Sequence, residues 1–254
     1  MRSNFWYVLL LMICLMTTAC SSSEDETVVA PELHPEFTEA EMNEAYKLKA
    51  DSKKEVERAG WPAVVYDEEL TMVDFESRTD LTPPANAEEF FSMILGCGSD
   101  YEFRKSAASR DDWVIPFKTH GQRGRMEVYN PYYKGVHIAG SCTLWYDKSG
   151  KMLRMEGSYQ PINDFNVTPA LTPNEAKEKM AMYLGVGVND LDPQVIDDCY
   201  ITFFPKAGRW QPRLCYAGHS KKRDYVSFIV IDANTGRLIN VVYYDDWCGT
   251  KSPL

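Results

Sequence analysis

Residues 168–184, with the sequence TPALTPNEAKEKMAMYL, decide the fold of the second half of the chain. Thr172 is a favourable N-cap, Pro173 suits the first helical position, and Glu175 stands three residues after the cap, as in a capping box. The stretch therefore predicts a helix over residues 173–184. Four β-favouring runs and a hairpin turn at 232–236 follow it: Val195–Phe204, Arg213–Ala217, Tyr225–Ile231 and Leu238–Tyr244.

The same order of elements occurs once before. Ala87–Leu95 predicts a short helix that Gly96 ends. Four β-favouring runs come after it: Met126–Tyr129, Val136–Ile138, Thr143–Tyr146 and Lys151–Glu156. We therefore expect an α+β fold of two tandem modules, each a helix packed on an antiparallel β-sheet.

An acidic N-terminal helical region is expected before these modules. Thr38 and Glu41 form a capping box, and the apolar spacing favours one charged helix over residues 38–59, which Gly60 and Pro62 end. Two short strands follow at 63–66 and 71–75, and the Thr82-Pro83-Pro84 stretch then favours a domain boundary near residue 80.

Composition excludes two broad classes. The 254 residues include 37 acidic and 27 basic side chains, so the net charge is −10, and 44% of the residues are hydrophobic. A basic nucleic-acid-binding protein and a disordered chain are both excluded. The acidity lies in residues 20–100, which hold 20 acidic and 6 basic side chains.

Residues 1–19 have the pattern of a cleaved export signal. Arg2 supplies one positive charge, and Phe5–Met16 is an unbroken apolar run that is too short to span a membrane. The small residues before Cys20 resemble the bacterial lipobox, which implies lipidation of the Cys20 thiol; ordinary signal-peptidase cleavage after Ala19 is the alternative. We expect a lipid-anchored protein of the cell envelope, at the outer membrane, on either its periplasmic or its surface face.

Two stretches resemble the propeptides of thermolysin-type and fungalysin-type zinc metalloproteases. Tyr132–Gly140, Thr143–Lys151 and Met155–Gly157 resemble the first propeptide domain, FTP. Leu171–Ala176, Arg213–Tyr216 and Phe228–Gly236 resemble the PepSY domain that follows it. The expected organisation is a signal peptide (1–19), an acidic tether (20–36), a helical stalk region (37–80), an FTP-like module (81–163), a PepSY-like module (164–246) and a tail (247–254).

The zinc motif of those proteases is missing. None of the four histidines is followed by Glu, so a His-Glu-x-x-His helix is absent, and we expect no catalytic residue, no metal ligand and no cofactor. The resemblance implies a propeptide-like protein that inhibits a zinc metalloprotease or assists its folding in trans. The alternative is a surface interaction or adhesion module for an unrelated ligand. Its partners would be an envelope protein and, through the N-terminal lipid, the membrane, with no role for nucleic acid.

Two groups of cysteines are candidates for chemistry. Cys199 and Cys215 face each other, and can form a disulfide, if Phe203 pairs with Gln211; two half-buried small residues are the alternative. The segment Asp245-Asp246-Trp247-Cys248 is a candidate partner-binding tail. The Cys248 thiolate can take the open position of a protease zinc, or it belongs to a frayed or disulfide-linked tail.

Aromatic residues crowd the first module. They favour a cross-strand ladder in the sheet core over a contact face for a protein or glycan. The residues are Tyr129, Tyr132, Tyr133, Trp145, Tyr146 and Tyr159.

Overall fold

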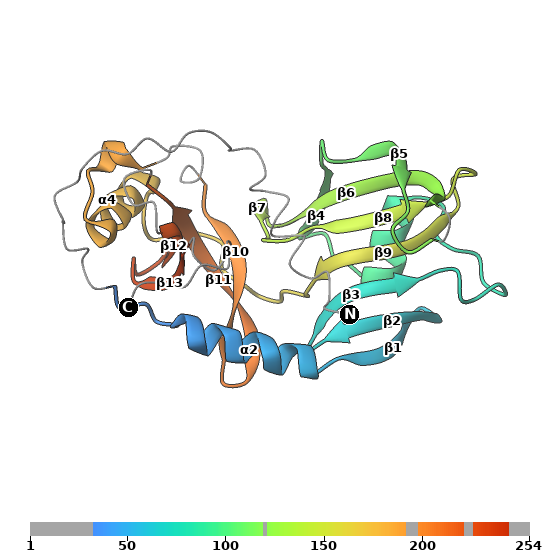
Figure 1. Ribbon diagram of the computed structural model, residues 1–254, viewed down its shortest axis with the longest axis horizontal. Coiled ribbons are helices and arrows are strands. Elements are labelled where there is room, and N and C mark those ends of the chain that lie inside the picture. Colours follow the sequence, from blue (N-terminus) through green and yellow to red (C-terminus); the bar gives the residue numbers. More distant parts are fainter. Residues whose placement is uncertain (1–32, 119–120, 192–197, 221–225, 244–254) are drawn as a thin grey trace. The chain divides into compact units, whose positions relative to one another are not determined.

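The computed structural model describes residues 33–118, 121–191, 198–220 and 226–243. It has an α+β fold with two antiparallel sheets, of nine and four strands, as the sequence predicts (Figure 1). The chain divides between Asp164 and Phe165 and, inside helix α2 (Glu39–Asp51), between Lys47 and Leu48. We call Leu48–Asp164 the nine-strand unit, and residues 33–47 with the described residues from Phe165 onward the four-strand unit.

The sheet of the nine-strand unit has the order β1-β2-β3-β9-β8-β6-β4, and β5 and β7 also pair with β6. Its strands are β1 (Lys54–Arg58), β2 (Trp61–Tyr66), β3 (Glu69–Asp74), β4 (Tyr101–Lys105), β5 (Arg110–Val114), β6 (Arg123–Tyr133), β7 (Val136–His137), β8 (Cys142–Tyr146) and β9 (Met152–Tyr159).

One short helix covers the core side of this sheet. α3 (Ala87–Phe90) starts at the Asn86 cap and continues as a π-helical turn over Phe91–Leu95, which Gly96 ends in the left-handed conformation. Phe90 is fully buried, and its ring contacts those of Phe75 and Phe91. The predicted helix is therefore confirmed, because its apolar face packs on the sheet core.

The region predicted as a stalk over residues 37–80 requires correction. The expected helix 38–59 ends at Asp51, and Lys54–Arg58 forms strand β1. Ala59 and Gly60 both have positive φ, which makes the tight hairpin that pairs β1 with β2. Since β3 in turn pairs with β9, these strands belong to the first module, and no domain boundary falls near residue 80.

The four-strand unit contains α4 (Pro173–Leu184), a 3₁₀ turn (Val188–Asp190) and a meander in the order β10-β11-β12-β13. The strands are β10 (Tyr200–Lys206), β11 (Arg209–Gly218), β12 (Val226–Asp232) and β13 (Leu238–Tyr243). Thr172 and Glu175 form the predicted capping box, and α4 has the predicted bounds.

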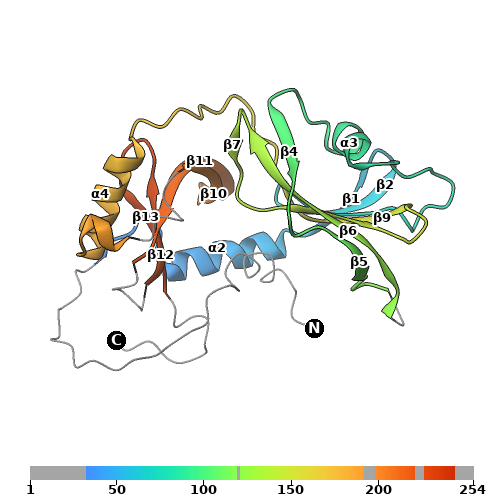
Figure 2. The same cartoon turned by 90° about the horizontal axis from the view of Figure 1, so that it is seen from above.

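Each face of the four-stranded sheet is covered (Figure 2). α4 buries Met180 and Leu184 on one face. On the other face, Cys215 and Ala217 of β11 pack with Met42 at the start of α2. We call residues 33–47 the strap. This segment is far from the sheet in sequence and covers the face of the sheet opposite α4.

Candidate functional site

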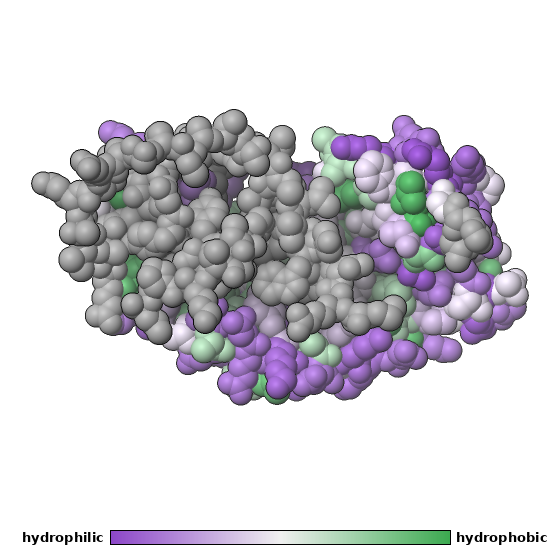
Figure 3. Space-filling model, viewed as in Figure 1, coloured by the Kyte–Doolittle hydropathy of each residue, from purple (hydrophilic) through white to green (hydrophobic). Residues whose placement is uncertain are grey.

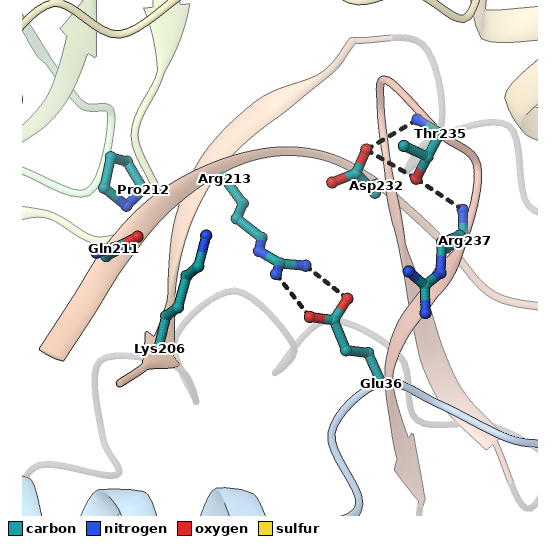
Figure 4. A pocket seen from close by; sticks show the side chains of 8 residues that line it. All are labelled: Glu36, Lys206, Gln211, Pro212, Arg213, Asp232, Thr235 and Arg237. Atoms are coloured by element: carbon teal, nitrogen blue, oxygen red, sulfur yellow. Dashed lines mark hydrogen bonds and ion pairs between the residues drawn. The ribbon is translucent and has the colours of Figure 1, made fainter. Parts of the chain in front are cut away.

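A hollow of about 350 Å³ opens on the strap side of the four-stranded sheet (Figure 4). It is lined by Glu36, Lys206, Gln211, Pro212, Arg213, Asp232, Thr235 and Arg237. Three of these side chains are cationic and two are carboxylates, so the hollow has a positive balance. Its walls come from the β10–β11 hairpin, from the β12–β13 turn and from the strap.

An ion pair between Glu36 and Arg213 occupies the middle of the hollow (Figure 4). The Arg213 guanidinium donates two hydrogen bonds to the Glu36 carboxylate, at 2.8 and 2.6 Å. Such a two-pronged pair is among the stronger charge-assisted contacts. Both side chains are largely shielded, with 22% of Arg213 and 28% of Glu36 exposed. The hydrogen bonds from Arg213 hold the pKa of Glu36 below its ordinary value.

Strand alternation explains where Arg213 points. Arg213 stands two residues before Cys215 on β11, so both side chains lie on the sheet face that the strap covers. A guanidinium on a covered face requires a partner. Glu36 supplies it, and the Glu36 and Phe37 N–H groups donate to the carbonyl oxygens of Leu238 and Ile239 on β13.

The other charged residues of the hollow differ in their hydrogen bonding and their exposure. Asp232 accepts hydrogen bonds from the N–H groups of Asn234 and Thr235, which stabilises the turn. Arg237 and Lys206 are exposed at the rim. The arrangement can therefore hold one carboxylate between cations, which the Glu36 side chain does here.

Nothing in the described part of the chain resembles a metal centre. Among those residues, no group of three or more His, Cys, Asp or Glu side chains lies close enough together to hold a metal ion.

The candidate disulfide between Cys199 and Cys215 is not formed, and both thiols are free. In the β10–β11 ladder, Phe203 pairs with Pro212 and Tyr200 pairs with Cys215. The register thus differs by one residue from the one that the disulfide requires. Because neighbouring residues of a strand point to opposite faces, the shift turns Cys199 away from Cys215.

The other predicted site residues lie outside the described residues: Cys20, Asp245, Asp246, Trp247 and Cys248. Neither Glu36 nor Arg213 is among the site residues predicted from the sequence, where Glu36 falls in the expected tether. One sequence signal points to Arg213. It alternates with Cys215 and Ala217, so a charged side chain shares a strand face with residues suited to burial.

The aromatic residues of the first module mainly build the core. Tyr133, Trp145, Tyr146 and Tyr159 are buried, as the ladder interpretation predicts. Tyr132 is half-buried instead, and the Arg104 guanidinium lies 3.9 Å from its ring centroid.

No family model and no curated protein matches the chain. Among solved structures, the chain is similar to the Bacillus megaterium YpeB C-terminal domain, with 12% identity and a TM-score of 0.31. The match covers 83% of this chain and 99% of that one. Within the described ranges, the helices are all too short or too polar to cross a membrane.

Proposed function

We propose that the chain is a non-catalytic binding protein of the cell envelope, anchored through a lipid on Cys20. It acts in trans on a thermolysin-like zinc metalloprotease, as an inhibitor or as a folding assistant. The observation that carries the proposal is the order of elements. A helix on an antiparallel sheet is followed by α4 and the β10–β13 meander, at the residues whose sequence resembles FTP and PepSY propeptide domains.

Two further features support binding rather than chemistry. The hollow around Arg213 offers cations to an acidic group, and its carboxylates are engaged with Arg213 and with the β12–β13 turn. A propeptide acts through surface complementarity, which requires no reactive group of its own. The test therefore measures an activity rather than a likeness of fold.

The experiment uses the soluble chain that starts after Cys20. It is titrated into a thermolysin-like metalloprotease from the producing cell, and peptide hydrolysis is followed. We expect saturable inhibition, or a higher yield of active enzyme when the denatured protease refolds in its presence. A serine protease from the same source is the control and should be unaffected in both assays.

A second function is an interaction module for an unrelated surface ligand. Affinity capture from the envelope and secreted fractions, with mass spectrometry of the retained proteins, separates the two. If neither metalloprotease assay responds and the capture recovers only non-protease surface proteins, the protease proposal is rejected and the interaction module is supported.

A further inference from the structure

The strap contacts the four-stranded sheet through apolar, aromatic and polar groups. Phe37 stacks on Phe204 with ring centroids 5.5 Å apart, and Tyr46 lies against Trp210 at 5.0 Å. Met42 is the buried residue of α2. The Glu36–Arg213 pair, the two backbone hydrogen bonds to β13 and a hydrogen bond from the Asn240 side-chain amide to the Phe37 carbonyl oxygen add to the attachment. The strap thus uses an acidic side chain, aromatic rings and one side of a helix to contact the sheet.

Under the strap lies an apolar surface, which we call the covered face. It consists of Phe204, Trp210, Cys215, Ala217, Val230 and Ile239, each less than 10% exposed. The hollow with Arg213 borders it, and Lys206 and Arg237 stand at the rim of that hollow. An apolar face next to cations is complementary to an amphipathic helix that carries a carboxylate at its N-terminal end.

The helical part of the strap buries few of its own side chains. α2 buries Met42, whereas α4, which is one residue shorter, buries four side chains. Tyr46 remains 43% exposed, and along the lower edge of Figure 3, where Figure 1 places α2, the visible surface is mainly hydrophilic. A helix of about 13 residues is marginal on its own, so the stability of α2 depends on these contacts and, beyond the strap, on the largely buried ion pair of Lys49 with Glu69. We therefore expect the strap to open more readily than α4.

We propose that the covered face is a docking site for an acidic amphipathic helix of a protein partner, and that the strap competes with this helix for the face within the same chain. The inference rests on the proposed function, which supplies a protein partner, and names the surface that the partner uses. The partner segment carries a carboxylate followed by an aromatic residue, to replace Glu36 and Phe37, and then apolar residues on one helix side. Charge complementarity with Arg213, Arg237 and Lys206 selects this occupant.

Competition by the strap sets a threshold for binding. A tethered segment acts at an effective concentration of roughly millimolar, so a partner must bind the bare face more tightly than the strap or add contacts outside it. Weakening the strap should then raise the affinity for any helix of the required chemistry.

The first test is native-state hydrogen exchange on the soluble full chain. We expect the amides of Phe37 and Met42 to exchange at least about tenfold faster than those of Met180 and Ala181 in α4. Equal protection of the strap and α4 would mean that the strap opens only with the whole unit, and the proposal would be wrong.

The second test measures binding in trans of a fluorescent peptide with the sequence of residues 33–47. A chain with Glu36→Gln and Phe37→Ala together should bind the peptide at least about tenfold more tightly than the unaltered chain. The matched control is Glu44→Gln, an exposed change in the same strap, which should bind like the unaltered chain. A peptide with Glu36→Lys should bind the double variant about tenfold more weakly than the native peptide.

Three results of this binding test would also overturn the proposal. The double variant binds the peptide no better than the unaltered chain, it unfolds because the strap is an integral layer of the core, or the Glu36→Lys peptide binds equally well. These readouts involve no protease. Failure of the metalloprotease assays with success here rejects the protease partner and leaves the docking face standing.

Discussion

The Glu36 carboxylate accepts two hydrogen bonds from the Arg213 guanidinium and so joins residues that are 177 positions apart in the chain. This pair is the polar anchor of the strap, beside the stacked rings of Phe37 and Phe204. It links the stability of the four-strand unit to the ionisation of one carboxyl group.

The first prediction concerns pH. Because Arg213 lowers the pKa of Glu36 from its ordinary value of 4.5, the pair stabilises the folded chain above that value. The contribution is lost as the pH falls through the lowered pKa. Near neutral pH, Glu36→Gln should reduce the free energy of unfolding by about 1 kcal/mol, and near pH 3, below the ordinary pKa of the carboxyl group, by clearly less. Urea unfolding at both pH values measures the difference, and an equal loss at both would contradict the ionic origin.

The second prediction concerns the free cysteines. Burial raises the pKa of Cys142, Cys215, Cys97 and Cys199. Their thiols should therefore react with iodoacetamide near neutral pH at least about tenfold more slowly in the native chain than in urea. Mass spectrometry of the alkylated peptides measures this. A peptide pair joined through Cys199 and Cys215 would show that Tyr200 does not pair with Cys215.

The third prediction compares two methionines of α4. Met180 is fully buried, whereas Met182 is 64% exposed. Met180→Ala should lower the free energy of unfolding by about 2–4 kcal/mol, because it leaves a cavity in the core. Met182→Ala should change it by less than about 0.5 kcal/mol. Chemical denaturation measures both, and similar losses would place α4 in a different orientation on the sheet.

The fourth prediction concerns the backbone at Gly157. This residue pairs with Cys142, has φ +141°, and a Cβ atom there would lie 2.1 Å from the carbonyl oxygen of Ser141. Gly157→Ala should therefore cost about 3 kcal/mol or more, since the obstructing atom is backbone. Gly150→Ala is the control, because its Cβ would meet open space, and it should cost about 1 kcal/mol. Thermal unfolding that ranks the two in the opposite order would rule out the close approach of β8 and β9.

Part of the fold could be predicted because its signals are local. The cap at Thr172 and the left-handed Gly185 bound α4 at both ends, and both interact with residues a few positions away. Lys54–Arg58 is the counterexample. Its apolar spacing suits a helix, but the hairpin at Ala59 and Gly60 pairs it with β2, and sheet pairing overrides the weak helical preference.

The candidate site could not be predicted in the same way. None of the predicted site residues lines the hollow, and most of them fall outside the described residues. Arg213 carried a signal as a charge alternating with apolar residues, but no local rule connects it to Glu36. The register that separates Cys199 from Cys215 likewise depends on the β10–β11 turn, where a shift of one residue reverses every side chain.

The sequence by itself determined the class of fold: two helices with defined caps, the strands that follow them, the hairpin turns between strands and the polar or apolar character of each face. These properties arise from interactions between residues that are near in the chain. Only the tertiary structure decided that β1–β3 join the first sheet and that the strap covers the second. Both are contacts between distant segments, chosen by which apolar face remained to be buried and which charge remained to be paired.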